Sequence, residues 1–99
     1  MQTDYLIALD EFCAKHDVEV SFISSLQQTG LIEIKTVKET GFIESSQLHQ
    51  LEKFIRFYYE LDINLEGIET ITHLLERLRS SQDEIISLRN RLRLYETNE

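Results

Sequence analysis

The chain has 99 residues, with three glycines, no proline and a formal net charge of −8 at pH 7. This length predicts one domain with a core of modest size, and a hydrophobic content of 41% argues against global disorder. Because duplex DNA is a dense line of negative charge, so acidic a protein is poorly matched to it, and a basic or mixed protein surface is the better-matched partner.

The acidic excess extends into the first half of the chain. Residues 1–44 hold three lysines and eight acids, a balance of −5, the acids being Asp4, Asp10, Glu11, Asp17, Glu19, Glu33, Glu39 and Glu44. A single cysteine, Cys13, leaves no internal disulfide and suits a reducing compartment. Without a long apolar run or a basic N-terminal start, the chain is expected to be soluble and cytoplasmic, with no membrane partner.

The first elements are short. The stretch `DYLIAL` predicts a brief strand that ends where Asp10 can cap a helix over residues 10–16. A second helix is expected from about Glu19 to Gln28, with Gly30 in the left-handed conformation just beyond its end.

A hairpin and a third helix follow. `LIEIKTV` and `GFIE` alternate apolar and polar residues on either side of a turn at residues 38–40, which predicts a β-hairpin. From Ser45 to about Leu61 apolar residues recur every three or four positions, and Ser45 or Ser46 can cap the helix that this spacing predicts. Tyr58 and Tyr59 adjoin near its end, so at most one can face the core squarely; the other either packs at the edge or anchors a partner.

A long last helix is predicted from a cap at Asn64 to about Tyr95, a length of ~45 Å. Its near half is expected to pack on the third helix through Ile68, Ile71, Leu74, Leu75 and Leu78. Its far half carries a heptad repeat, which predicts a homodimeric coiled coil with a seam that includes Leu78, Ile85, Leu88, Leu92 and Tyr95. In a parallel pair, Glu84 would face Arg89 and Arg91 would face Glu96, both attractive contacts.

Residues suited to catalysis or metal binding are sparse. `CAKH` places Cys13 and His16 on one helical turn, but a second cysteine is lacking and the other histidines fall in other elements. Cys13 is therefore expected in the core and His16 on the surface. The chain contains no HExxH, no GxSxG and no glycine-rich phosphate loop, so neither an enzyme nor a cofactor is expected.

The order of these elements resembles the MerR-type winged helix-turn-helix, and `ELDINLEGIETI` looks like the segment that enters the dimerisation helix of that family. Within it, `DEFC`, `TGLIEI`, `ELDINLEGI` and `LRNRLRLYE` are similar to the small chaperone modulators of the CbpM type. The expected fold is mainly α with a small β-hairpin wing, a winged helix-turn-helix-like domain at residues 1–62 and a long C-terminal helix at residues 63–99. The resemblance implies a non-enzymatic modulator that binds the J-domain of a DnaJ/CbpA-like co-chaperone and inhibits it.

The alternative is a MerR-like DNA-binding transcriptional regulator. MerR-type regulators typically carry an arginine and tyrosines before Gly-Leu-Leu, where this chain has Ser24, Ser25 and Leu26. Each lost arginine removes a charged phosphate contact, and the possible wing contacts Lys35 and Lys38 are flanked by glutamates, so DNA binding is not expected. A third possibility is a purely structural dimerisation module.

The candidate residues for a protein partner are chosen by charge. Four acids gather at the starts of the first two helices, with an aromatic residue beside them as a possible apolar anchor: Asp10, Glu11, Asp17, Glu19 and Phe22. Their simpler interpretation is that the acids favour the helix starts and keep the surface solvated.

Overall fold

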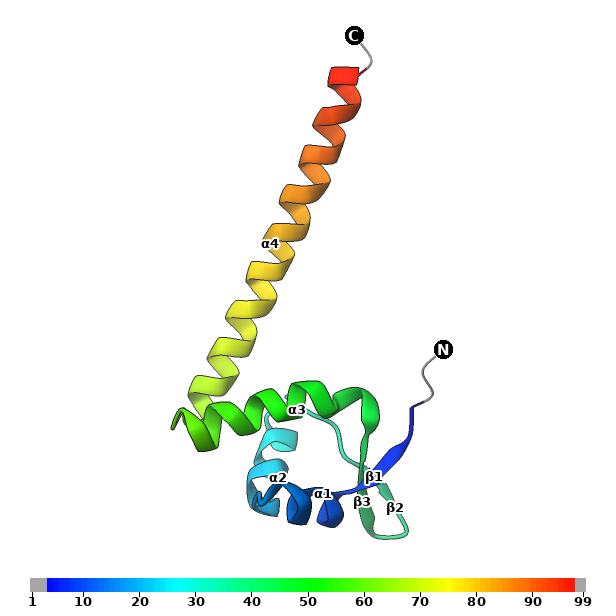
Figure 1. Cartoon of the computed structure of the whole chain (residues 1–99), viewed down its shortest axis with the longest axis vertical. Helices are drawn as coiled ribbons and strands as arrows, with labels where there is room; N and C mark the ends of the chain where they lie inside the picture. Colours follow the sequence, from blue (N-terminus) through cyan, green and yellow to red (C-terminus); the bar gives the residue numbers. More distant parts are fainter. Residues whose placement is uncertain (1–3, 98–99) are drawn as a thin grey trace. The chain divides into compact units, whose positions relative to one another are not determined.

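The computed structural model describes residues 4–97, which form a mainly helical structure with one small sheet (Figure 1). The elements, in chain order, are β1 (Leu6–Ala8), α1 (Leu9–His16), α2 (Val20–Gln28), β2 (Lys35–Val37), β3 (Thr40–Glu44), a 3-10 turn (Ser45–Gln47), α3 (Leu48–Ile55), a π turn (Arg56–Glu60) and α4 (Leu65–Thr97). This order confirms the predicted fold class, a winged helix-turn-helix followed by a long C-terminal helix.

The sheet has three antiparallel strands in the order β1-β3-β2, so the wing hairpin carries β1 as its third strand. Ile7 of β1 lies opposite Ile43, and Ala8 lies opposite Phe42. β2 begins only at Lys35, later than the alternating pattern suggested. The side chain of Gln47 takes the place of a strand partner for Glu33, because its amide accepts from the Glu33 N–H at 2.7 Å and donates to the Glu33 carbonyl at 2.8 Å.

The core lies between α1, α2, the sheet, α3 and the start of α4. Its buried members are Phe12, Cys13, Val18, Phe22, Ile23, Leu26, Ile32, Ile43, Leu51, Phe54 and Ile68. Cys13 is thus a core residue, as expected. His16 is exposed, with its ring stacked on Phe12 at a centroid distance of 4.2 Å.

The helix ends test the predicted caps. Gly30 has a φ of 83°, and the Leu31 N–H donates to the Leu26 carbonyl at 3.0 Å, which confirms the left-handed end of α2. The Asn64 Oδ1 accepts from the Gly67 N–H at 2.8 Å, which confirms the cap of α4.

Two other caps were wrongly predicted. α1 already begins at Leu9, so Asp10 lies inside its first turn, and the N-cap residue Ala8 has no capping side chain. Ser45 accepts a hydrogen bond through its Oγ from the Tyr5 N–H at 3.0 Å, so its side chain ties β1 to the end of β3 instead of capping a helix. The 3-10 turn that follows has no side-chain cap either.

The last helix, α4, has 33 residues and a length of about 50 Å. The chain divides into two compact units, Met1–Glu69 and Thr70–Glu99, so the division falls within this helix. Ile68 belongs to the core, whereas Leu74, Leu75 and Leu78 are exposed in the single chain, and their packing on the third helix stays a prediction. Among the described residues, no helix is both long enough and apolar enough to cross a membrane.

Candidate functional site

The second helix of a helix-turn-helix is the element that would read DNA, and here it is uncharged. α2 has the sequence VSFISSLQQ, with Phe22, Ile23 and Leu26 turned into the core. Ser25, one of the residues in the place of phosphate contacts, donates its hydroxyl to the Ser21 carbonyl of the same helix at 2.9 Å. α2 therefore offers no cation to a phosphate, and this serine's hydroxyl proton is already used.

A tyrosine lies over the start of α2. The backbone N–H of Glu19, the N-cap residue, donates to the Tyr59 hydroxyl at 3.1 Å, and the Glu19 carboxylate accepts from the Ser21 hydroxyl at 3.3 Å. Helix N-termini are common phosphate sites because they present N–H groups and a partial positive charge. At this helix start, a phenol and a carboxylate of the protein itself lie where a phosphate would approach.

The wing contains two lysines, and one of them is paired. The Lys35 ammonium forms an ion pair with the Glu44 carboxylate across the β2–β3 hairpin. The two side chains are also hydrogen-bonded to each other. The hydrogen bond and the charge of the partner raise the pKa of Lys35 and lower the pKa of Glu44. Lys38 lies at the hairpin turn beside Glu39, and both residues have positive φ angles, 49° and 67°. The positive charge of the wing is thus largely offset by its own acids.

Three aromatic rings pack between α2 and the π turn. Phe22 stacks on Tyr58 with centroids 4.3 Å apart and meets Tyr59 edge-on at 5.6 Å, and the two tyrosines meet edge-on at 5.0 Å. Phe22 is only 5% exposed, whereas Tyr58 and Tyr59 are 40% and 41% exposed. Neither tyrosine is buried in the core, and a partner at this place would touch the tyrosines before it touched Phe22.

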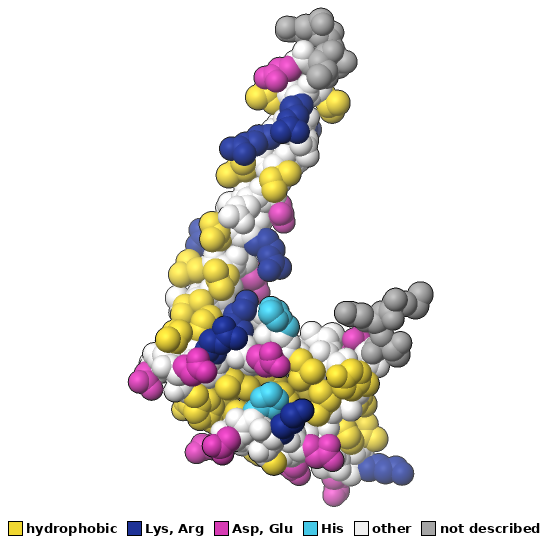
Figure 2. Space-filling model, in the orientation of Figure 1, with side chains coloured by type: hydrophobic (Ala, Val, Ile, Leu, Met, Phe, Trp, Pro, Cys, Tyr) yellow, Lys and Arg dark blue, Asp and Glu magenta, His cyan; other side chains and the backbone are white. Residues whose placement is uncertain are grey.

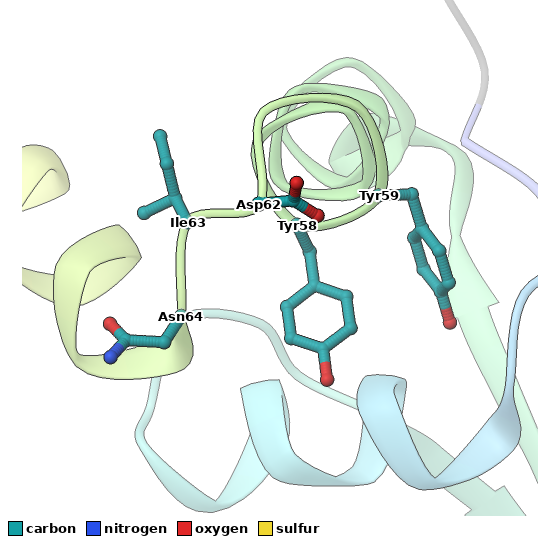
Figure 3. Close-up of a pocket in the computed structure, with 5 residues that line it drawn as sticks. All are labelled: Tyr58, Tyr59, Asp62, Ile63 and Asn64. Atoms are coloured by element: carbon teal, nitrogen blue, oxygen red, sulfur yellow. The ribbon is translucent and has the colours of Figure 1, made fainter.

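Two open hollows adjoin this cluster. One, of about 350 Å³, is lined by Tyr58, Tyr59, Asp62, Ile63 and Asn64 (Figure 3). The other, of about 120 Å³, is lined by Glu19, Ser21, Phe22, Ser25, Tyr58 and Leu65. Tyr58 lines both hollows. In Figure 3 the tyrosine rings extend side by side from the π turn towards α2.

The four candidate acids are all exposed, but they do not form one cluster. Asp10 and Glu11 lie in the first turn of α1, whereas Asp17 ends that helix in a left-handed conformation and Glu19 precedes α2. The two pairs are therefore about 10 Å apart along the axis of α1. Only Glu19 lines one of the hollows.

The chemistry around Cys13 is that of a buried thiol. The pKa of the Cys13 thiol is raised mainly by burial and also by the nearby charge of Asp10, so the reactive thiolate is disfavoured. Within residues 4–97, no group of three or more His, Cys, Asp or Glu side chains is placed to hold a metal ion.

The predicted dimerisation residues of α4 present an unpartnered apolar surface in the single chain. Leu78, Ile85, Leu88, Leu92 and Tyr95 are 49% to 77% exposed. Figure 2 shows hydrophobic side chains along this helix, interspersed with lysine and arginine.

Phe22 and the tyrosine pair could be singled out from the sequence. Asp62, which lines the larger hollow with the two tyrosines, could not. Its only local signal is the polar pair Asp62 and Asn64 between two helical stretches, which is typical of any helix connection. The hydrogen bond between Glu19 and Tyr59 joins residues 40 positions apart, so no local sequence pattern predicts it.

Comparison with known proteins supports the architecture. The model of the MerR HTH family regulatory proteins matches residues 7–90 of the chain. No curated protein and no solved structure matches it. Since the family model spans both the helix-turn-helix and most of α4, the chain belongs to the MerR HTH family of regulatory proteins.

Proposed function

We propose that this protein is a non-enzymatic chaperone modulator that binds the J-domain of a DnaJ-like co-chaperone and inhibits it. The observation that carries the proposal is the loss of phosphate-binding features from the DNA-reading half of the fold. α2 has no cation, its N-cap N–H is bonded to Tyr59, and Lys35 of the wing is paired with Glu44. A family fold with such a surface is better suited to a protein than to DNA.

The choice of a J-domain comes from the resemblance to CbpM-type modulators. J-domains of this kind carry a basic helix beside the His-Pro-Asp loop that engages a DnaK-type chaperone. A protein of net charge −8 is complementary to such a helix. By covering it, the protein would compete with the chaperone, and stimulated ATP hydrolysis would fall without any chemistry by the modulator.

The exposed acids Asp10, Glu11, Asp17 and Glu19 are the proposed contacts, with Phe22 supporting the tyrosines beside Glu19. Exposed charges at the rim of an interface act mainly on the association rate and its salt dependence. Buried anchors act mainly on dissociation.

The second part of the proposal is a homodimer formed through α4. A second copy of the chain would cover Leu78, Ile85, Leu88 and Leu92, which are exposed in the single chain and recur at heptad spacing. If the pair is parallel, Glu84 faces Arg89 and Arg91 faces Glu96, and both contacts are attractive.

The test is inhibition of the co-chaperone from the same organism, measured as DnaK-type ATPase activity stimulated by its J-domain. One variant carries Asp10→Asn, Glu11→Gln, Asp17→Asn and Glu19→Gln. Its matched control carries Glu52→Gln, Glu60→Gln, Glu76→Gln and Asp83→Asn, which removes the same charge from exposed positions elsewhere.

We expect the parent and the control to inhibit, and the first variant to inhibit less, because it should associate with the J-domain more slowly and with a weaker salt dependence. Equal inhibition by all three proteins would reject the proposed contacts. A parent that binds no J-domain of its own organism, or that binds a DNA operator specifically instead, would reject the function.

A further inference from the structure

The larger hollow, at the π turn and the connection that follows it, has the features of a receptor for a positively charged side chain. One face of the Tyr58 ring rests on Phe22, and the remainder of this tyrosine is among the exposed aromatic surfaces of the protein. Tyr59 stands edge-on to it at 5.0 Å, with its hydroxyl fixed by the Glu19 N–H. The tyrosine pair is therefore held in place before any partner arrives.

The backbone that presents these rings is unusual. Leu61 N–H donates to the Arg56 carbonyl at 3.1 Å, a bond to the fifth preceding residue that defines the π turn. Asp62 follows with a φ of 54°, and the Ile63 N–H then donates to the Phe57 carbonyl at 2.9 Å. π-Helical segments are frequent at functional sites. Here the turn directs two consecutive tyrosines towards the same helix (Figure 3).

The charges that line the two hollows have one sign. Asp62 lines the larger hollow and Glu19 the smaller, and neither lining includes a lysine or an arginine. Within the described residues, the Tyr58 hydroxyl has no hydrogen-bond partner, whereas the Asn64 amide oxygen is used by the Gly67 N–H. A ligand in the larger hollow meets two exposed aromatic rings, the Asp62 carboxylate and an unused phenol.

We infer that the Tyr58–Tyr59–Asp62 hollow binds an arginine side chain of a protein partner. A guanidinium group is planar and stacks on aromatic rings, and its N–H groups donate to carboxylates and to phenol oxygens. It therefore matches the tyrosine rings, the Asp62 carboxylate and the Tyr58 hydroxyl. A volume of about 350 Å³ lies at the lower limit of ligand pockets, which suits a single side chain better than a larger organic ligand. The inference deepens the proposed function, since a basic helix of a J-domain would supply such an arginine, but its test does not require that partner.

The test is an NMR titration of the full chain with the blocked tripeptide acetyl-Gly-Arg-Gly-amide, followed at the tyrosine ring resonances. The reference peptide contains citrulline, which has nearly the shape of arginine without its charge. We expect a weak, saturable shift at Tyr58 and Tyr59 with the arginine peptide and about tenfold weaker binding of the citrulline peptide.

Three variants locate the site. Tyr58→Leu should weaken binding of the arginine peptide about two- to fivefold, the value of one cation–π contact. Asp62→Asn should weaken it by a similar factor and keep the fold, because asparagine also tolerates a positive φ. Tyr5→Leu, a change at an exposed tyrosine outside both hollows, should leave binding unchanged.

Equal shifts with both peptides, or shifts confined to other tyrosines, would overturn the inference. If Tyr58→Leu fails to fold, the two peptides and Asp62→Asn still decide. If the protein binds the arginine peptide but no J-domain, the arginine site stands and the proposed function is rejected. If it binds the J-domain but not the peptide, the proposed function stands and the arginine site is rejected.

Discussion

Gly30, just beyond α2, gives a prediction about backbone conformation. It ends α2 at a φ of 83°, and a Cβ atom added to it would meet nothing within 4 Å. A substitution there therefore tests backbone conformation alone, without any effect of packing.

We expect Gly30→Ala to lower the free energy of unfolding by about 1 kcal/mol, because an L-residue in the left-handed region costs about 1–2 kcal/mol and reduced freedom of the unfolded chain offsets part of that cost. Urea unfolding followed by circular dichroism measures the change. Gly30→Asn is the control and should cost less, since asparagine adopts this conformation more readily. If both substitutions cost the same, left-handed strain is not what Gly30 avoids.

The ion pair of the wing gives a prediction at the scale of one charge. Lys35 holds the pKa of the Glu44 carboxyl below its ordinary value through a hydrogen bond and its charge. A lowered pKa in the folded state means that the pair stabilises the fold at neutral pH. This contribution is lost as the pH falls through the lowered pKa of Glu44.

A carbon-detected NMR titration of the Glu44 side chain should give a midpoint below the ordinary glutamate value in the parent. Lys35→Met should raise that midpoint towards the ordinary value, whereas Lys38→Met should leave it unchanged. A midpoint that does not respond to Lys35→Met would mean that the pair does not persist in solution, and Lys35 would then be available to other anions.

At the scale of elements, the features that follow from local patterns were predicted well. The second helix was expected from Glu19 to Gln28 and forms at Val20–Gln28, and the hairpin turns where its polar residues lie. Apolar periodicity and a glycine at a helix end are signals that span only a few residues, so these elements can be predicted from a single sequence.

Contacts between distant segments were not predicted. β1 pairs with β3 about 36 residues away, and Gln47 satisfies both backbone groups of Glu33 in place of a strand. Neither pairing has a local signature, because many strands and amides could serve equally well. The candidate site follows the same rule: its acids could be chosen by charge, but the tyrosine contact with Glu19 and the place of Asp62 depend on the folded chain.

The dimer proposed for α4 can be tested with one pair of substitutions. Leu88→Glu and Leu92→Glu place charges at the heptad seam, where they would be buried without partners, so the double variant should be a folded monomer. The measurement is light scattering combined with size-exclusion chromatography, with circular dichroism to confirm that the helix content is retained.

The control applies the same chemical change beside the seam. Ile86 and Leu94 are also exposed and apolar but lie outside the a and d positions, so Ile86→Glu with Leu94→Glu should leave a dimer. A parent that is monomeric at high micromolar concentration would remove the proposed dimer. Dissociation by the control variant alone would place the interface on another face of the helix.

At the scale of the whole molecule, the family fold and the surface point to different partners. Family membership supplies a regulatory helix-turn-helix, whereas a net charge of −8 and a reading helix without cations oppose its use on DNA. Counterion release from phosphates supplies most of the non-specific affinity of DNA-binding proteins, and each such contact needs a lysine or an arginine.

The parent should therefore bind a fluorescent duplex no more tightly than a Kd of about 10⁻⁴ M at physiological salt, as measured by anisotropy. A second variant tests the cause: Ser24→Arg and Ser25→Arg with Glu44→Gln would restore two cations on α2 and release Lys35. It should bind the duplex more tightly than the parent, with a dependence of log K on log salt that steepens by about 0.9 for each new phosphate contact. A specific, sub-micromolar complex of the parent would instead make this protein a DNA-binding regulator, because its few cations would then suffice.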